Sequence, residues 1–171
     1  YYGGRTSQSV IEGGGTGGTN TVKISGSRQW YFSTNPIPID TSHTYEGKFR
    51  VRRTSLPEES HHTGNTKDTG SVYAGVYCMD ENFNHISIGA GTHRYFIARA
   101  DRLAIENEWE VFTGTITSES AGSNPTDHQF FKPGTKYVRP MFIVNFNNSA
   151  SVHEIDYLTF DDLSAGGGNP F

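Results

Sequence analysis

The sequence has little of the material from which helical or disulfide-stabilised proteins are built. Leucine occurs only four times and alanine is scarce, whereas glycine occurs 20 times. Glycine disfavours helices because it loses the most backbone freedom on folding. The single cysteine, Cys78, excludes an internal disulfide. No apolar run approaches the roughly 18 residues of a membrane-spanning helix. We therefore expect a chain rich in strands and turns, with no membrane contact.

A strong charge of either sign is also lacking. The net charge is −4 and the isoelectric point is about 6.0, so the chain has no general attraction for nucleic acid and no nucleic-acid partner is predicted. It opens on Tyr1-Tyr2-Gly3, with neither an initiator methionine nor a basic-then-apolar signal segment. We therefore expect a piece of a larger multidomain protein with an extracellular location, and any export signal would lie outside these residues.

What the chain does have is aromatic volume in alternating segments. There are 11 phenylalanines, nine tyrosines and two tryptophans, which compensate for the missing leucine. In the segment 45–53, Tyr45, Phe49 and Val51 share one strand face and the charged residues share the other. Roughly eight to ten such short strands favour an all-β, two-sheet antiparallel jelly-roll β-sandwich. We also expect a turn at Asp80–Asn84, strands at about 85–89 and 93–99, a helix-like composition at 100–108 and a long loop at 118–135. We assign residues 1–163 to this single domain and 164–171 to a flexible tail or linker.

Motifs for catalysis are weak throughout the chain. Residues 13–18 satisfy the pattern G-x-G-x-x-G, but no helix follows them, as a dinucleotide site requires. The seven histidines lack the spacing of a zinc site, and no serine-nucleophile motif is present. Residues 130–137 resemble one strand of jelly-roll alginate lyases, but the two partner strands that supply catalytic residues there have no counterpart. The sequence therefore predicts a binding module rather than an enzyme.

The order of five short motifs is more informative. They are Val10-Ile11-Glu12-Gly13-Gly14, Val22-Lys23-Ile24-Ser25-Gly26, Thr44–Arg52, Trp109–Ile116 and Val152–Phe160. In order and spacing they resemble the sandwich carbohydrate-binding modules of families four, nine and twenty-two, and similar domains occur in viral fibres and adhesive proteins. The chain departs from that pattern where the tryptophan after the N-terminal glutamate is missing and where the second aspartate of the last strand is Tyr157.

The resemblance implies a structural calcium. In that family the ion joins the N-terminal glutamate to the first aspartate of the final strand, which here are Glu12 and Asp156, and Asn20 is a further candidate ligand. Calcium takes six to eight oxygens and accepts backbone carbonyls from irregular loops. The alternative is that Glu12 is a surface residue and Asp156 caps a strand end. The resemblance also implies that Trp109 belongs to the core.

Sugar binding requires flat aromatic faces flanked by hydrogen-bonding groups. Tyr73 and Tyr77 share one face of a strand, about 13 Å apart by strand rise, a separation on the scale of a few sugar units. Tyrosine is also frequent in strands for packing reasons alone. Arginine pairs bidentately with carboxylate or sulfate, which suits an anionic polysaccharide. The residues expected to border the same sugar-binding groove as the two tyrosines are Arg50, Arg52, Arg139 and Asn145. Trp30 and Tyr31 are a second candidate platform near a loop.

The sequence thus predicts a non-catalytic module that binds a polysaccharide or oligosaccharide on an aromatic-lined concave sheet or at a loop edge. The alternative from another class is a receptor-binding or structural domain of a fibre or adhesin. A polysaccharide lyase or glycoside hydrolase is the third reading, and the missing catalytic motifs argue against it.

Overall fold

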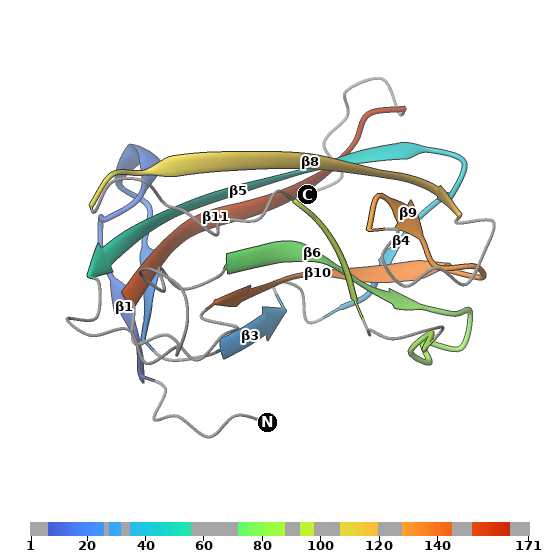
Figure 1. Ribbon diagram of the computed structural model, residues 1–171, viewed down its shortest axis with the longest axis horizontal. Helices are drawn as coiled ribbons and strands as arrows, with labels where there is room; N and C mark the ends of the chain where they lie inside the picture. The colour runs from blue at the N-terminus through green and yellow to red at the C-terminus, as the bar shows by residue number, and fades with distance from the viewer. Residues whose placement is uncertain are drawn as a thin grey trace, which may run out of the picture.

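The computed structural model describes residues 7–25, 28–31, 35–55, 72–87, 93–97, 107–119, 128–144 and 152–164. They form two sheets stacked face to face, with β5, β8 and β11 in one layer and β3, β6 and β10 in the other (Figure 1). The only helical turn among them is the 3-10 turn Thr16–Gly18. None of the described residues belongs to a helix long and apolar enough to cross a membrane.

Sheet A has six strands and sheet B has five. The order in sheet A is β1 (Ser7–Ile11), β2 (Thr21–Ser25), β11 (Val152–Asp162), β5 (Thr44–Ser55), β8 (Glu110–Glu119) and β9 (Phe130–Phe131). The order in sheet B is β3 (Arg28–Tyr31), β10 (Tyr137–Val144), β6 (Val72–Met79) and β7 (His93–Ile97), and β4 (Ile37–Pro38) also pairs with β10. Neighbouring strands are antiparallel except β8 and β9.

The chain repeatedly crosses between the two sheets. Strand β2 lies in sheet A, β3 and β4 in sheet B, β5 in A, β6 and β7 in B, β8 and β9 in A, β10 in B and β11 in A. This alternation confirms the predicted jelly-roll sandwich. Of the strand expected at about 85–89, residues 85–87 are described, and they form a bridge between His85 and Met79. The loop expected at 118–135 contains the short strand β9. Most of the helix-like segment 100–108 and of the tail 164–171 lies outside the described residues.

The core forms where the inward faces of the two sheets meet. Along β5 the exposure alternates residue by residue, with Tyr45, Phe49 and Val51 buried as predicted. Phe49 of sheet A stacks against Phe142 of sheet B, with ring centroids 5.7 Å apart. On β6 the small alternate residues fill the core, and Cys78 is completely buried among them. Aromatic side chains therefore supply the volume that leucine supplies in most cores.

A pair of facing glycines lets the edge strand β7 approach the inner face of sheet A. Gly47 on β5 lies directly opposite Gly114 on β8. A Cβ on Gly47 would lie 2.9 Å from the ring of Phe96 and 2.8 Å from Ile97. A Cβ on Gly114 would collide with the carbonyl oxygen of Phe96. The two glycines form a notch, called here the glycine notch, that positions β7 beside β6.

The sandwich interior also contains a buried basic pair. His153 on β11 and Arg53 on β5 are register partners, and their side chains are 0% and 4% exposed. Among the described residues, neither ring nitrogen of His153 has a hydrogen-bond partner, and the same holds for Nε and Nη1 of Arg53. Burial, together with the charge of Arg53, lowers the pKa of His153 from 6.5 to about 3. His153 is therefore neutral in the folded protein at physiological pH.

This burial predicts an acid-labile fold. Because the folded-state pKa of His153 lies below its unfolded value of 6.5, the folded state binds fewer protons and stability falls as the pH drops below about 6.5. Replacing His153→Leu should remove about 2 kcal/mol of the loss in unfolding free energy between about pH 7.5 and about pH 5. Chemical denaturation at both pH values measures this difference. An unchanged pH dependence in His153→Leu would contradict the assignment.

Candidate functional site

The outer face of sheet B carries a continuous row of aromatic rings. Ring centroids are 5.5 Å apart between Tyr73 and Tyr95, 5.5 Å between Tyr95 and His93, and 5.5 Å between His93 and Tyr77. The ring of His85 then stacks on Tyr77 at 4.5 Å with an interplanar angle of 17°. These five residues, called here the aromatic row, come from β6, β7 and the turn after β6. The row joins the two predicted tyrosines through residues that the prediction did not include.

Local sequence features hold the row in place. Tyr77 lies opposite His93 in the β6–β7 register, and a bulge at Gly75 shifts the register beyond it. A side chain at Gly75 would collide with the carbonyl oxygen of Arg94, so the bulge requires glycine there. The hydroxyl of Tyr95 lies 3.1 Å from Nδ1 of His93, and its amide donates to Nδ1 of His128 at 3.2 Å.

The turn Asp80–Asn84 places His85 at the end of the row. One carboxylate oxygen of Asp80 accepts the amide hydrogens of Asn82 and Asn84, both at 2.8 Å. Phe83 adopts a left-handed conformation with φ of 63°, and its ring packs on Tyr137 at 4.5 Å. The Asp80–Asn84 turn predicted from the sequence is confirmed.

The aromatic row is electrically neutral at its centre. Burial, with smaller contributions from His85 and Lys132, lowers the pKa of His93 from 6.5 to about 4. The neutral imidazole of His93 is itself buried, at 8% exposed, and lies between the rings of Tyr77 and Tyr95. The three tyrosines of the row are each partly exposed to solvent. They are Tyr73, Tyr77 and Tyr95.

Arg139 lies directly beside the row. On β10 it is the register partner of Tyr77, and directly opposite residues of neighbouring strands share a face. Its side chain forms no ion pair or hydrogen bond with the residues that the structure describes, and its Nε is buried without a partner among them. Within the part of the chain that the structure describes, the face therefore combines aromatic rings with a cation that has no carboxylate partner.

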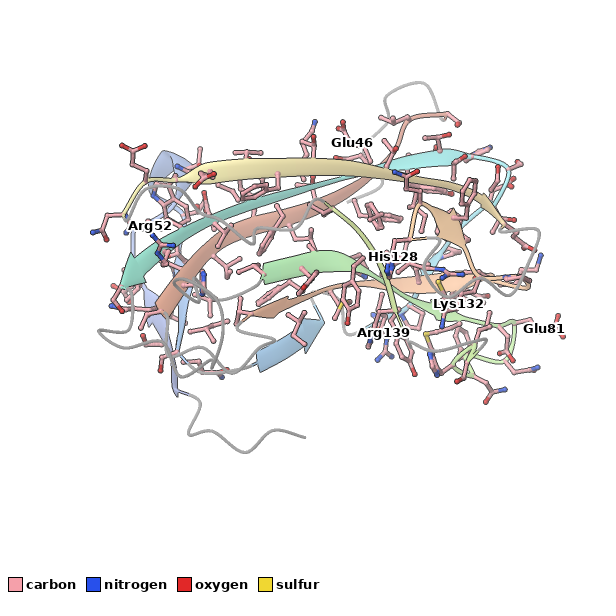
Figure 2. The ribbon with its side chains drawn as sticks, viewed as in Figure 1. Glu46, Arg52, Glu81, His128, Lys132 and Arg139 are labelled. Atoms are coloured by element: carbon pink, nitrogen blue, oxygen red, sulfur yellow. The ribbon has the colours of Figure 1, made fainter. Side chains whose placement is uncertain are left out.

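Arg50 and Arg52 lie on the opposite side of the molecule, on the outer face of sheet A. Arg50 pairs with Asp156 on β11, and Arg52 donates through Nε at 3.0 Å and Nη2 at 2.8 Å to one oxygen of Glu154. Figure 2 shows Arg52 and Arg139 on different layers, towards opposite ends of the sandwich. This placement corrects the expectation that Arg50 and Arg52 border the same groove as Tyr73 and Tyr77.

Trp109 is also placed differently from the expectation. Instead of entering the core it is partly exposed, and the guanidinium carbons of Arg50 and Arg52 lie 4.3 Å and 4.6 Å from its ring centroid. These are cation–π distances. The tryptophan therefore orders two arginines on the outer face of sheet A.

Three further predicted residues are only partly located. The backbone of Trp30 pairs with Phe142 and that of Tyr31 with Met141, which brings β3 to the edge of sheet B beside β10. The side chains of both residues lie outside the described part of the structure, as does Asn145. The hypothesis of a second aromatic platform at Trp30 and Tyr31 stays a prediction.

The predicted calcium ligands do not assemble around a common point. Glu12 is exposed, and the side-chain oxygen of Asn20 accepts the amide hydrogen of Gly13 at 3.3 Å. Oδ2 of Asp156 accepts from the amide and hydroxyl of Thr16 and from Arg50, while Oδ1 accepts from the hydroxyl of Thr19. Within the described residues no group of three or more His, Cys, Asp or Glu side chains could hold a metal ion.

This donor set does not fit calcium. The ion requires six to eight oxygens and is favoured by several carboxylates. Both oxygens of Asp156 already accept hydrogen bonds, and the other described carboxylate against the same loop, Glu154, pairs with Arg52 and accepts from the hydroxyl of Thr21. A guanidinium in direct contact with Asp156 also repels a divalent cation.

The segment that resembles a lyase strand has a structural role. Lys132 is completely buried, and its ammonium group donates to the carbonyl oxygen of Ile86 at 2.8 Å. Thr135 closes the following turn by donating to the carbonyl oxygen of Lys132 at 2.6 Å. Lys132 thus anchors the segment that carries His85, and it does not face solvent.

Comparison with solved structures identifies the architecture. The chain has the β-sandwich fold of carbohydrate-binding modules. One similar structure contains the family 22 carbohydrate-binding and family 10 catalytic modules of an endo-1,4-β-D-xylanase from Clostridium thermocellum complexed with xylohexaose. The TM-score is 0.51 and the identity 11%, over 91% of this chain and 24% of that one.

An arabinose-bound family 51 α-L-arabinofuranosidase gives a TM-score of 0.52 at 9% identity, over 93% of this chain and 22% of that one. The family 22 xylan-binding domain of a xylanase from Paenibacillus barcinonensis gives 0.49 at 10% identity, over 94% and 83% of the two chains. The chain thus spans less than a quarter of the two longer proteins. No protein-family model matches the sequence, and no curated protein matches it.

The neutrality of the row can be measured directly. A two-dimensional NMR titration of the imidazole groups should give His93 an apparent pKa near 4. His43 is the internal control, because its hydrogen bond with Asp162 raises the pKa of its ring above 6.5. A His93 pKa at or above that of His43 would show that the ring is solvated and that the aromatic row is not packed as described.

Proposed function

We propose that the chain is a non-catalytic module that binds a polysaccharide or oligosaccharide along the outer face of sheet B. The observation that carries this proposal is the aromatic row beside Arg139. Pyranose rings present patches of C–H groups that pack on aromatic faces, and their hydroxyls need hydrogen-bond partners at the edge of those faces. The aromatic row offers both ring faces and hydrogen-bonding groups, the latter from its phenols and imidazoles.

The length of the aromatic row suits a chain of sugars rather than a single one. Tyr73 and Tyr77 are four residues apart on β6, about 13 Å by strand rise, and His85 extends the row beyond Tyr77. The proposal is supported by the likeness of this fold to 24% of the chain of a Clostridium thermocellum xylanase whose two modules were complexed with xylohexaose. A few sugar units would contact the row at once.

Arg139 favours a ligand with acidic groups. A guanidinium pairs bidentately with carboxylate or sulfate, and Arg139 has no acidic partner among the described residues. The other two candidate arginines are neutralised by Asp156 and Glu154. We therefore assign the preference for an anionic polysaccharide to Arg139 alone.

The module would act outside the cell as part of a larger protein. Tethering a binding module to a catalytic or fibre domain raises the effective concentration of that domain at the polysaccharide surface. This role requires no catalytic group on the module, and the burial of Lys132 in the lyase-like segment agrees with that.

Removing rings from the row should weaken binding. A panel of soluble polysaccharides, comprising xylan, β-glucan, alginate and polygalacturonate, is first tested by affinity electrophoresis. Against any retained member, Tyr77→Ala and Tyr95→Ala should each weaken binding by about tenfold or more, because a buried aromatic contact is worth more than about 1.4 kcal/mol. Calorimetry supplies the dissociation constants.

Tyr157→Ala is the matched control, since Tyr157 is a partly exposed tyrosine opposite Arg50 on the outer face of sheet A. Equal losses in Tyr157→Ala and Tyr77→Ala would move the site away from sheet B. A blank panel with a folded trimeric protein in sedimentation would instead favour the fibre or adhesin role.

A separate variant tests the preference for an anionic polysaccharide. Arg139→Gln should weaken binding to polygalacturonate by about tenfold and reduce its dependence on salt, because one charge-assisted pair is lost. Binding to a neutral polysaccharide should change by less than about twofold. Lys48→Gln, which removes an exposed cation from sheet A, is the control. If Arg139→Gln binds polygalacturonate as tightly as the unmodified protein does, the assigned preference is wrong.

A further inference from the structure

The glycine-rich loop between β1 and β2 is fastened to β11 through one carboxylate. Oδ2 of Asp156 accepts from the amide of Thr16 at 3.0 Å and from its hydroxyl at 2.7 Å. Oδ1 accepts from the hydroxyl of Thr19 at 3.1 Å. The loop lies so close that a Cβ on Gly15 would collide with Oδ1. The loop and Asp156 therefore fit only in one arrangement.

The charge of this carboxylate is balanced by Arg50. The side chain of Asp156 is only 2% exposed, and an unpaired charge at such a depth would strongly destabilise the fold. Arg50 on the neighbouring strand contacts Oδ2 of Asp156 and also donates to the hydroxyl of Thr16 at 2.8 Å. Burial alone raises the pKa of Asp156, but the hydrogen bonds from Thr16, Arg50 and Thr19 hold it below the ordinary value.

A second pair of the same kind lies one step along the strands. Glu154, with its side chain 4% exposed, pairs with Arg52 and accepts a hydrogen bond from the hydroxyl of Thr21. Both guanidinium groups stack on the ring of Trp109. The ring of Trp109 thus holds both guanidinium groups beside the two carboxylates.

We propose that Arg50 takes the place at which the family resemblance implies a calcium ion, so that the loop is fixed without a metal. The guanidinium supplies the positive charge at Asp156, the threonines supply the remaining donors, and Glu12 is left exposed and without a role at this point. A divalent ion would have to displace a cation held by Asp156, Thr16 and Trp109. The fold of this chain should therefore be indifferent to calcium.

The first test compares thermal unfolding of the whole chain in millimolar calcium and in excess chelator. The two melting temperatures should agree within about 1 °C, because a ligand that does not bind the folded state adds no stability. Calorimetric titration with calcium chloride alone should give no binding heat in that range. A melting temperature that chelator lowers by several degrees, with the effect abolished in Asp156→Asn, would overturn the proposal.

The second test is a double-mutant cycle on the ion pair of Arg50 and Asp156. Arg50→Met and Asp156→Asn should each lower the melting temperature by about 4 °C or more, and the double variant should lose much less than their sum. Glu46 and Lys48 form the control cycle, since they are an exposed ion pair on the same sheet face and such pairs contribute little. If the two losses in melting temperature add up in the double variant, Arg50 and Asp156 do not stabilise the loop as a pair and the proposal is wrong.

A further readout does not depend on the double variant folding. In Arg50→Met alone, hydrogen exchange of the Thr16 amide should accelerate at least tenfold in calcium and in chelator alike, because its acceptor Asp156 loses its fixed partner. Protection that calcium restores to the level of the unmodified protein would show that a metal, and not Arg50, fixes the loop.

Discussion

The close approach of β7 to sheet A is the constraint on which the proposed binding face depends. Two facing glycines, Gly47 and Gly114, leave the space into which Phe96 and Ile97 pack. With those side chains anchored inside, the alternate residues His93 and Tyr95 lie on the outer face of sheet B, between Tyr73 and Tyr77. The glycine notch on one sheet thus determines the aromatic surface of the other. Side chains at these two positions would move β7 outward and separate the rings.

The two outer faces of the sandwich use arginine in opposite ways. On sheet A, Arg50 and Arg52 form ion pairs with Asp156 and Glu154, and both guanidinium groups pack on the ring of Trp109. On sheet B, Arg139 is left without an acidic partner among the described residues. The arginines on sheet A therefore hold strands and loop together, whereas the charge of Arg139 is available for the proposed ligand. An arginine identified in a strand sequence can serve either purpose, and only its neighbours decide which.

The sequence predicted what a single strand can determine. Period-two alternation correctly placed Tyr45, Phe49 and Val51 inside, and Tyr73 and Tyr77 on one outer face. It could not tell that β5 and β6, which are consecutive strands, belong to different sheets, and so it grouped Arg50 with Tyr77. Tyr95 and His93 carried a signal, since they alternate on a predicted strand, but joining them to the row needed the order of sheet B. Trp109 was assigned by family position, whereas its partners are charged side chains from a strand distant in sequence.

The arrangement of β1, β2 and β11 has a mechanical consequence. Ser7, Ser25 and Val152 lie side by side at one end of sheet A, while β11 runs on to Asp162 towards the other end. Tension applied between Ser7 and Asp162 would load these strands along their length, so their hydrogen bonds would share the force rather than open one at a time. The contact of Arg50 and Thr16 with Asp156 lies across that same line of force. A domain that must hold a larger protein against a surface would in this way resist being pulled apart along the axis on which it is pulled.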